Sequence, residues 1–281
     1  MPNTTATERP NTRTQCDHLA IERQKIVKQF DAKFTGCYIA GGALTATFTN
    51  KSIKDFDLYF KTKEAFEDAV HYAYDHSFWC VAVSGRAITF TKGGQIYQLM
   101  SFRFFPTPEA IFESFDFTCC MAALDVDTQQ FNLHPRFLID ASRRDIVFNP
   151  GTAFPLASGF RILKYQQRGY TIQKREWMKL IAAISFKKIE SWEELKDQIG
   201  GQYGDQVALD TSKPFCLANV IESLDQAHTE SRYDTEVITV GDTTAEVPKG
   251  PEIPENAEMA MAMIFPQEFA KQCRDEAKAT R

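Results

Sequence analysis

Residues 38–60 read YIAGGALTATFTNKSIKDFDLYF, and the order of features in this stretch decides the fold that we expect. The stretch begins as a short apolar strand that ends in the glycine pair Gly41 and Gly42. A segment of helical length follows, and DFDLYF then alternates as a strand does, with Asp55 and Asp57 at positions i and i+2. Together these features indicate a place where a phosphate and a metal meet.

A Gly-Gly turn before a helix suits phosphate binding, because glycine lets the backbone approach an anion and the helix start offers unpaired N–H groups. Asp55 and Asp57 share one face of their strand, since strand side chains alternate, and Phe56 turns into the core. Two such carboxylates repel unless a cation lies between them, and Mg²⁺ prefers oxygen ligands completed by substrate phosphates. Either feature alone would be structural, but the combination favours metal-assisted phosphoryl or nucleotidyl transfer.

The bulk composition is that of an ordinary globular protein. The 281 residues are 43% hydrophobic and 25% charged, which suggests one large domain or two smaller ones. The net charge of -5 gives no global electrostatic reason to bind nucleic acid. The seven cysteines show no CxxC pair and no zinc spacing, so we expect free thiols in a reducing compartment. No apolar run approaches the roughly 20 residues of a membrane helix, and the polar N-terminus lacks a signal-peptide core, so we expect a cytoplasmic protein.

Changes in composition and period divide the chain into five parts. Residues 1–17 are polar and expected to be disordered. Residues 18–155 form the expected catalytic head, and residues 156–221 are helical, as a neck and body. Residues 222–258 hold ten acidic and two basic residues and read as a mobile linker, and residues 259–281 read as an amphipathic segment that docks on the body or a partner. The expected fold class is α+β, a small mixed or antiparallel sheet flanked by helices and followed by an all-α region.

The periodicity places the elements of the head. Thr62 is the expected N-cap of a clear amphipathic helix over residues 62–78. Residues 80–91 and 95–105 form a predicted hairpin around a Lys-Gly-Gly turn. Further helices are predicted over residues 18–30, 43–50 and 107–115, and segments 116–127 and 134–142 read as strands or short helical pieces.

Several segments resemble one family when they are taken in order. GGALTATFTNKSIKDFDLYF is similar to the signature of the polymerase-β-type nucleotidyltransferase superfamily, a Gly-Gly followed about a dozen residues later by Asp-x-Asp. The head and neck of tRNA nucleotidyltransferases and bacterial poly(A) polymerases carry further motifs that resemble segments here. These segments are YQLMSFR (97–103), SFDFTCCMAAL (114–124), IDASRRDI (139–146) and ASGFRILKY (157–165). The resemblance spans about residues 36–172, roughly half the chain.

The resemblance implies a reaction and a set of roles. Asp55 and Asp57 would be catalytic and would hold Mg²⁺ or Mn²⁺, and Gly41 and Gly42 would hold the β- and γ-phosphates of an NTP. An NMP would pass to an acceptor hydroxyl with release of pyrophosphate. The acceptor would be an RNA 3′ end, a small molecule or a protein side chain. The other residues expected to contact the nucleotide are Arg103, Asp116, Arg161 and Lys164.

The departures from the family pattern limit what the resemblance implies. The third metal-side carboxylate falls on Gln98, whose amide oxygen can coordinate but cannot neutralise Mg²⁺ or take a proton. Asp116 is the candidate substitute. In the neck, Ala157 and Ser158 replace the acidic pair that reads incoming bases, which argues against a CCA-adding enzyme. Ser114 and Phe115 likewise replace an arginine pair, so one ribose or phosphate contact is expected to be absent.

Residues 161–188 form a local basic region in an acidic protein. They hold eight Lys and Arg residues and a single acid, Glu176. Such a region suits an NTP triphosphate or the backbone of RNA, including tRNA, although charge runs commonly just solvate helices. Tyr165, Tyr170 and Trp177 offer stacking surfaces for a base, or core packing at helical spacing.

A second hypothesis follows from Gln98. The chain is then a catalytically inactive descendant that binds nucleotide or RNA, or serves as an assembly component, with the acidic segment and the terminal segment as partner-binding parts. Cys119 and Cys120 read as core thiols, and no histidine is given a role. The size, divergence and tail are compatible with a mobile-element or phage source, and the oligomeric state stays open.

Overall fold

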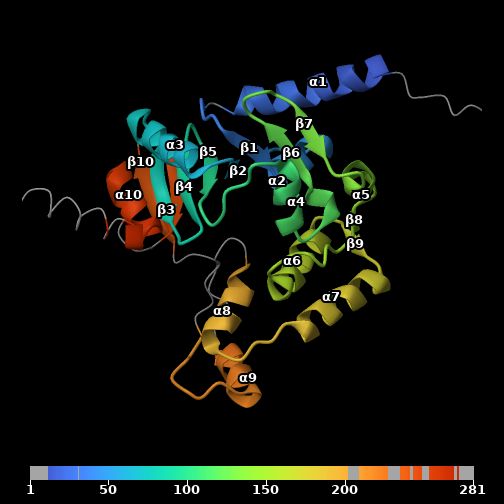
Figure 1. Cartoon of the computed structure of the whole chain (residues 1–281), viewed down its shortest axis with the longest axis vertical. Coiled ribbons are helices and arrows are strands. Elements are labelled where there is room, and N and C mark those ends of the chain that lie inside the picture. Colours follow the sequence, from blue (N-terminus) through green and yellow to red (C-terminus); the bar gives the residue numbers. More distant parts are fainter. Residues whose placement is uncertain are drawn as a thin grey trace, which may run out of the picture.

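The structure is a computed structural model that describes residues 12–30, 32–201, 209–226, 235–240, 243–248, 253–268 and 271. Figure 1 shows a sheet-containing head with a group of helices below it. The helices are α1 (Thr12–Gln29), α2 (Gly42–Phe48), α3 (Lys63–Asp75), α4 (Pro108–Ser114), a 3-10 turn (Thr118–Cys120), α5 (Phe137–Arg143), α6 (Pro155–Gln167), α7 (Lys174–Phe186), α8 (Trp192–Gly200), α9 (Leu217–Gln226) and α10 (Ala257–Ile264). The strands are β1 (Cys37–Ala40), β2 (Asp55–Phe60), β3 (Trp79–Val83), β4 (Ala87–Lys92), β5 (Gln95–Met100), β6 (Ala122–Asp125), β7 (Phe131–Leu133), β8 (Asp145–Ile146), β9 (Thr171–Ile172), β10 (Thr235–Val240) and β11 (Thr243–Pro248).

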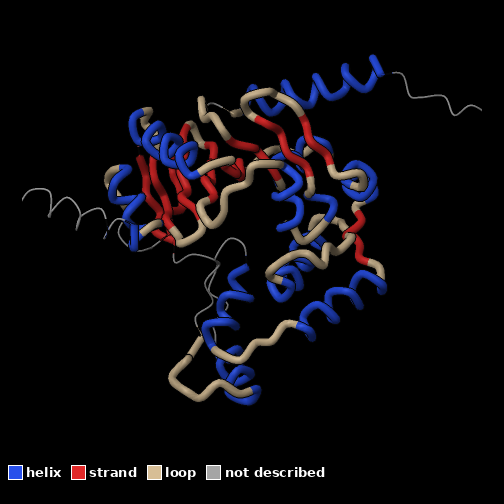
Figure 2. The backbone as a smooth tube through the Cα atoms, viewed as in Figure 1, coloured by secondary structure: helices blue, strands red, loops and turns tan. Residues whose placement is uncertain are grey.

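Seven strands form the main sheet in the order β3-β4-β5-β2-β1-β6-β7. Neighbouring strands are antiparallel except β2 and β5, which run parallel. Figure 2 shows these strands together in the head, with helices on either side and a mainly helical region below. This mixed, mostly antiparallel sheet flanked by helices confirms the expected α+β class.

One face of the sheet is buried by aromatic side chains. Phe56 on β2 and Tyr97 on β5 are in register and fully buried, and their rings stack with centroids 5.7 Å apart. Phe30, Phe34 and Phe78 surround Tyr97 at centroid distances of 5.8, 6.2 and 5.2 Å. Because strand side chains alternate, this burial of Phe56 turns the aspartates on either side of it to the opposite face.

The opposite face is covered over only part of its length. Tyr59, near the end of β2, is fully buried against the rings of Phe105 and Phe115. At the start of the same strand Asp55 is half-buried, and Ile96 on β5 is 40% exposed. The sheet therefore leaves an open face at the N-terminal end of β2.

Helix α3 forms as its sequence predicts. The Thr62 hydroxyl accepts a hydrogen bond from the Ala65 N–H at 3.2 Å, so it satisfies one of the unpaired donors at the helix start. Phe66, Val70 and Ala73 lie on the buried face. Helix α3 therefore packs one apolar stripe onto the sheet and leaves its polar side to solvent.

Helix α6 joins the helical region to the head. Ile162 and Tyr165 of α6 belong to the main core. Gly159 of α6 faces α7, since a Cβ atom placed on it would be in van der Waals contact with Leu180 Cδ2 at 3.9 Å. Helices α8 and α9 have a small core of their own around Leu195 and Ile199. An ion pair between Arg86 and Asp197 connects α8 to the start of β4.

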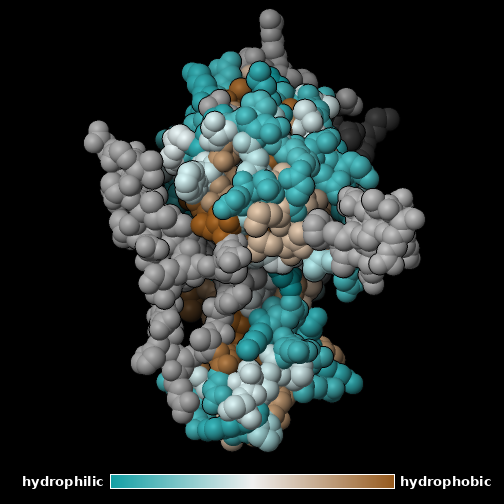
Figure 3. Space-filling view, turned by 90° about the vertical axis from the view of Figure 1, so that its left-hand side faces the viewer, coloured by the Kyte–Doolittle hydropathy of each residue, from teal (hydrophilic) through white to brown (hydrophobic). Residues whose placement is uncertain are grey.

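The C-terminal helix α10 packs against α3 and β3. Ala260 of α10 is fully buried, and the rings of Phe265 and Phe66 lie 6.1 Å apart. Figure 3 shows the side of the molecule that lies on the left in Figure 1, where the described surface of the head is mainly hydrophilic with small hydrophobic patches. Among the described helices, none has both the length and the apolar character of a membrane span.

Two expectations about the N-terminal part of the chain and the head need correction. Residues 12–17, expected to be disordered, form the first part of α1, because extending an existing helix costs less than nucleating one. The rest of that expectation, residues 1–11, lies outside the described residues. The stretch 80–91 contains two strands instead of one hairpin arm, because the Ser84 hydroxyl accepts from the N–H groups of Arg86 and Ala87 and closes a turn.

The acidic segment 222–258 also differs from the expected linker. It begins with the end of α9, and β10 and β11 then pair as an antiparallel hairpin in which Ile238 faces Ala245. The alternating sequence TEVITV supports a strand even where the net charge is acidic. Residues 227–234, 241–242 and 249–252 of this segment lie outside the described part of the chain.

Candidate active site

The glycine turn lies where β1 ends and α2 begins. Gly41 adopts φ 75° and ψ −125°, a conformation that side chains disfavour and glycine tolerates. Its N–H donates to the Ala122 carbonyl at 3.3 Å, and its own carbonyl accepts from the Thr45 N–H at 3.1 Å. These two bonds hold the turn between the sheet and the first turn of α2.

The two carboxylates of β2 face this turn. Ala40, the last residue of β1, pairs with Asp57, which is 7% exposed. A Cβ atom placed on Gly41 would lie 3.6 Å from Asp57 Oδ2, and one placed on Gly42 would lie 3.9 Å from Asp55 Oδ1. The structure thus brings together the four residues of the predicted metal and phosphate site.

The donor set here fits a magnesium ion that a substrate completes. Among the described residues no group of three or more His, Cys, Asp or Glu side chains is arranged to hold a metal. Asp55 and Asp57 supply two carboxylates on one face, and Mg²⁺ is commonly bound through one or two carboxylates together with substrate phosphates and water. The glycine turn leaves the space beside both carboxylates free of side-chain atoms of its own.

Gln98 lies beside this pair on the neighbouring strand. It is in register with Asp57 across the parallel β2–β5 contact, and with Thr89 on β4. Residues in register share a face, so Gln98 lies on the same face of the sheet as Asp57. The residue beside Asp57 on β5 is therefore a neutral amide and not a carboxylate.

Asp116 does not complete the carboxylate pair, which corrects its expected role as a substitute. Its Oδ2 lies 2.9 Å from Arg161 Nε of α6, and the side chain is almost fully buried. Burial raises the pKa of Asp116, and the Arg161 guanidinium opposes that rise. The neighbouring Phe115 ring lies 3.6 Å from a Cβ placed on Gly41. The ion pair thus anchors α6 beside the glycine turn.

Arg103 and Lys164 occupy different surroundings. The Arg103 guanidinium lies 5.3 Å from the centroid of the Phe105 ring, and the Phe105 N–H donates to the Phe60 carbonyl at the end of β2. Arg103 is therefore anchored at the opposite end of β2 from Asp55. Lys164 is half-buried on α6, one turn after Arg161.

The basic helices are partly neutralised from within. Glu176 is 1% exposed and accepts hydrogen bonds from Lys179 Nζ at 3.0 Å, Arg175 Nε at 3.2 Å and the Phe148 N–H at 3.1 Å. Burial raises the pKa of Glu176, but these contacts outweigh it and hold the pKa below its ordinary value. Tyr165 and Tyr170 are each 5% exposed, so they are core residues and offer no stacking surface.

The remaining candidates are structural. Cys119 and Cys120 are buried free thiols, as predicted, and Cys120 contacts the Tyr165 hydroxyl.

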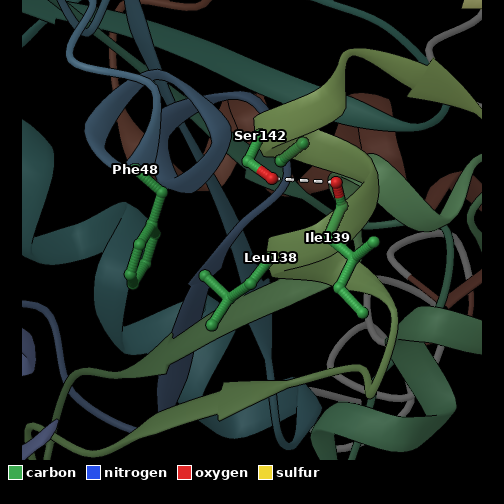
Figure 4. A pocket seen from close by; sticks show the side chains of 5 residues that line it. Phe48, Leu138, Ile139 and Ser142 are labelled. Carbon is green, nitrogen blue, oxygen red and sulfur yellow. Dashed lines mark hydrogen bonds between the residues drawn. The ribbon is translucent and has the colours of Figure 1, made fainter.

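An apolar pocket lies between the end of α2 and α5, lined by Phe48, Leu138, Ile139, Ala141 and Ser142 (Figure 4). Phe48 is the last residue of α2, whereas Gly41 lies just before the first. The pocket and the carboxylate site are therefore at opposite ends of α2.

Two exposed residues on the same sheet face as the carboxylates were not indicated by the motifs. Trp79, at the start of β3, is 60% exposed, and Ile96 is in register with Asp55. A large aromatic residue at the start of a strand, four positions after the end of α3, is the sequence signal for Trp79. The position of Ile96 beside Asp55 depends on the strand register, which cannot be read from the sequence.

Comparison with known proteins gives a family likeness for the first half of the chain. Residues 11–144 match the family described as "Gad2: Gabija anti-defense 2 family protein". The protein "Gabija anti-defense 2" of Bacillus phage SPbetaL7 is 40% identical to this chain over 166 residues. That match covers 59% of this chain and 42% of the phage protein, so the chain spans less than half of this relative.

Solved structures with a similar arrangement are CCA-adding enzymes. One, solved with CTP, has a TM-score of 0.45 and 17% identity, covering 60% of this chain and 46% of that one. The Thermotoga maritima CCA-adding enzyme, solved with tRNA, has a TM-score of 0.43 and 14% identity, covering 78% and 52%. The Bacillus stearothermophilus enzyme, solved with CTP, has a TM-score of 0.41 and 16% identity, covering 68% and 49%. Likenesses at this level assign no reaction to the chain.

Proposed function

We propose that the chain is a Mg²⁺-dependent nucleotidyltransferase that moves an NMP from an NTP to an acceptor hydroxyl and releases pyrophosphate. The observation that supports this most directly is the arrangement of Asp55 and Asp57 against Gly41 and Gly42, with oxygens 3.6 and 3.9 Å from the Cβ positions that the glycines leave empty. A carboxylate pair can hold a metal-bound triphosphate, and a turn without side chains leaves room for its phosphates.

Asp55 and Asp57 would hold Mg²⁺, or Mn²⁺ in its place. A metal held by these two carboxylates would supply positive charge to the triphosphate and would lower the pKa of the attacking hydroxyl. The backbone of Gly41 and Gly42 would contact the β- and γ-phosphates. The acceptor oxygen forms a bond to the α-phosphorus in line, and the bond from that phosphorus to the pyrophosphate oxygen breaks.

Gln98 shapes the acceptor side of this reaction. Its amide would hold the acceptor hydroxyl beside Asp57, but it cannot remove the proton, which leaves to water or to a substrate phosphate. A positioned base contributes typically 10²- to 10⁴-fold to a rate, so the reaction proposed here runs without that contribution from position 98. The same residue is the observation that favours the second candidate, a protein that binds nucleotide without turning it over.

The positive charge for the triphosphate would come from α6. Lys164 lies one helical turn from Arg161, whose guanidinium is oriented by Asp116. The exposed Lys174, Lys187 and Lys188 of the basic region 161–188 are the candidates for contacts to an RNA or tRNA backbone.

The likeness to the SPbetaL7 protein suggests the setting of the reaction. Its name, "Gabija anti-defense 2", leads us to propose that this chain, too, acts against the Gabija defence, as a phage protein in the cytoplasm of the host. The acceptor modified in that setting would be an RNA end, a small molecule or a protein side chain.

Label transfer tests the proposal. The protein is incubated with Mg²⁺, each α-labelled NTP in turn, and total RNA or a host extract as the source of acceptor. The proposal predicts transfer that Asp57→Asn abolishes and that Asp68→Asn, a matched change at an exposed acid of α3, leaves unchanged. Transfer that survives Asp57→Asn would sink the proposed mechanism.

A thermal-shift measurement separates the two candidates. A binding-only protein would show Mg²⁺-dependent stabilisation by NTPs that Asp55→Asn removes, with no transfer for any nucleotide. A relic scaffold would show neither transfer nor stabilisation.

A further inference from the structure

Four side chains line up across the sheet from its edge to the candidate metal site. Trp79 on β3 is in register with Thr91 on β4, Thr91 with Ile96 on β5, and Ile96 with Asp55 on β2. Residues in register on adjacent strands place their side chains on the same face. The row therefore shares the face of the metal-site carboxylates, and we name these four residues the open row.

The next row shows that the open row is turned to solvent. Cys80, Phe90, Tyr97 and Phe56 follow the same register and are 5%, 0%, 0% and 0% exposed. In the open row, by contrast, Trp79 is 60% and Ile96 is 40% exposed, and Thr91 and Asp55 are half-buried. An indole with this much free surface, on a face that leads to a catalytic carboxylate, is placed to contact a substrate.

The length of the open row fits several nucleotides. Adjacent strands lie about 4.8 Å apart, so the three steps from Asp55 to Trp79 span about 14 Å. Four stacking steps of about 3.4 Å each, which join five nucleotides, cover the same distance. A single strand with its 3′ end at Asp55 therefore reaches Trp79 with a base a few positions upstream.

The charge at this end of the sheet is complementary to a phosphate backbone. Lys51 and Lys54 are exposed in the loop that leads into β2. The Gln95 side chain donates to the Lys54 carbonyl at 3.0 Å and ties this loop to the β4–β5 turn. Lys92, at the same turn, covers the Phe78 ring with its Nζ 4.5 Å from the centroid, and therefore belongs to the opposite, buried face of the sheet. Exposed cations at the Asp55 end of the row and an exposed aromatic residue at its other end are the components from which single-strand binding surfaces are built.

We propose that the open row binds the acceptor of the reaction, and that this acceptor is the 3′ end of a single-stranded nucleic acid with a base stacked on Trp79. The proposal rests on the nucleotidyltransferase function for the identity of the acceptor, but the binding itself needs no turnover. It assigns acceptor binding to β3–β5 rather than to the basic helices α6 and α7.

The test measures binding of a fluorescent eight-nucleotide single strand in the absence of NTP. Stacking on an aromatic side chain is worth about 1–3 kcal/mol per base, so Trp79→Ala should weaken Kd by about 5- to 150-fold. Trp79→Phe keeps a ring and should weaken it less. Leu138→Ala, at a 47% exposed site on α5, is the matched control and should leave Kd unchanged.

Two further arms keep the inference separate from the proposed function. Asp57→Asn should keep oligonucleotide binding while losing label transfer, and Trp79→Ala should keep the Mg²⁺-dependent thermal shift by NTP while losing transfer to the oligonucleotide. The inference is overturned if Trp79→Ala binds the strand as the wild type does. It is also overturned if Lys174→Ala with Lys187→Ala removes binding while Trp79→Ala does not, or if Trp79→Ala impairs only transfer to a protein.

Discussion

Replacing Gly41 by alanine separates the backbone cost of the glycine turn from its role in the site. Gly41 has φ 75° and ψ −125°, so alanine is strained there by about 1–3 kcal/mol. The added methyl group meets no clash, because its nearest atoms, Asp57 Oδ2 and the Phe115 ring, lie 3.6 Å away. We expect a folded protein with a lower midpoint of urea unfolding and a free-energy loss within that range.

The same methyl group would fill the space that the proposed site offers to a triphosphate. Gly41→Ala should therefore also remove the Mg²⁺-dependent stabilisation by NTP in a thermal-shift assay. Gly93→Ala is the matched control, because Gly93 has φ 59° and open space around it in the β4–β5 turn. It should cost about 1–2 kcal/mol of stability and leave nucleotide binding intact. Equal nucleotide binding by the two variants would refute the assignment of the turn.

Three other predictions follow from the contacts around the site. Arg161→Met should lower the free energy of unfolding at pH 7 by about 3–5 kcal/mol, because it leaves the buried Asp116 unpaired, and adding Asp116→Asn should restore most of that loss. The loss should shrink as the pH falls, since burial already raises the pKa of Asp116 and protonation removes the unpaired charge. Glu176→Gln should cost about 1–3 kcal/mol above pH 4.5, the ordinary pKa of that group, and the cost should vanish as the pH falls through the lower pKa of the folded state. Gln98→Asp should raise the rate of transfer by about 10²-fold or more, measured with the same NTP and acceptor, and an unchanged rate would show that position 98 does not face the acceptor.

The local parts of the fold could be predicted from the sequence. The Thr62 cap needs only the residue type and the helical pattern that follows it, and its hydrogen bond to Ala65 is present. The convergence of Asp55 and Asp57 on one face follows from the period of a strand, and the burial of Phe56 confirms it. These features depend on neighbours within a few residues, where sequence pattern and structure agree.

The parts that depend on distant contacts could not be predicted. Asp116 and Arg161 are 45 positions apart in the sequence, and only the packing of α6 on the head makes them an ion pair. Arg103 follows β5 in the motif order, yet Phe105 anchors its segment to the far end of β2. The open row needs a register across four strands, which residue spacing alone does not fix.

Composition was misleading where local pattern opposed it. Residues 222–258 are acidic, and this suggested a linker, but the alternation over 235–240 supports a strand that pairs with β11. In residues 161–188 the composition suggested a uniformly basic surface. The one acid, Glu176, is however buried and accepts hydrogen bonds from Lys179 and Arg175, so part of that positive charge is neutralised. The charge count of a segment therefore does not tell which of its charged side chains are exposed and which are paired.

The most direct test of the central claim is pyrophosphate release by the purified protein with Mg²⁺, each NTP and a single-stranded acceptor. We predict release with at least one NTP that requires both Mg²⁺ and acceptor, is lost in Asp57→Asn and is retained in Asp68→Asn. Release that is unchanged in Asp57→Asn, or no release by the wild type with any NTP and acceptor, would contradict the claim that Asp55 and Asp57 form the metal site of a nucleotidyltransferase.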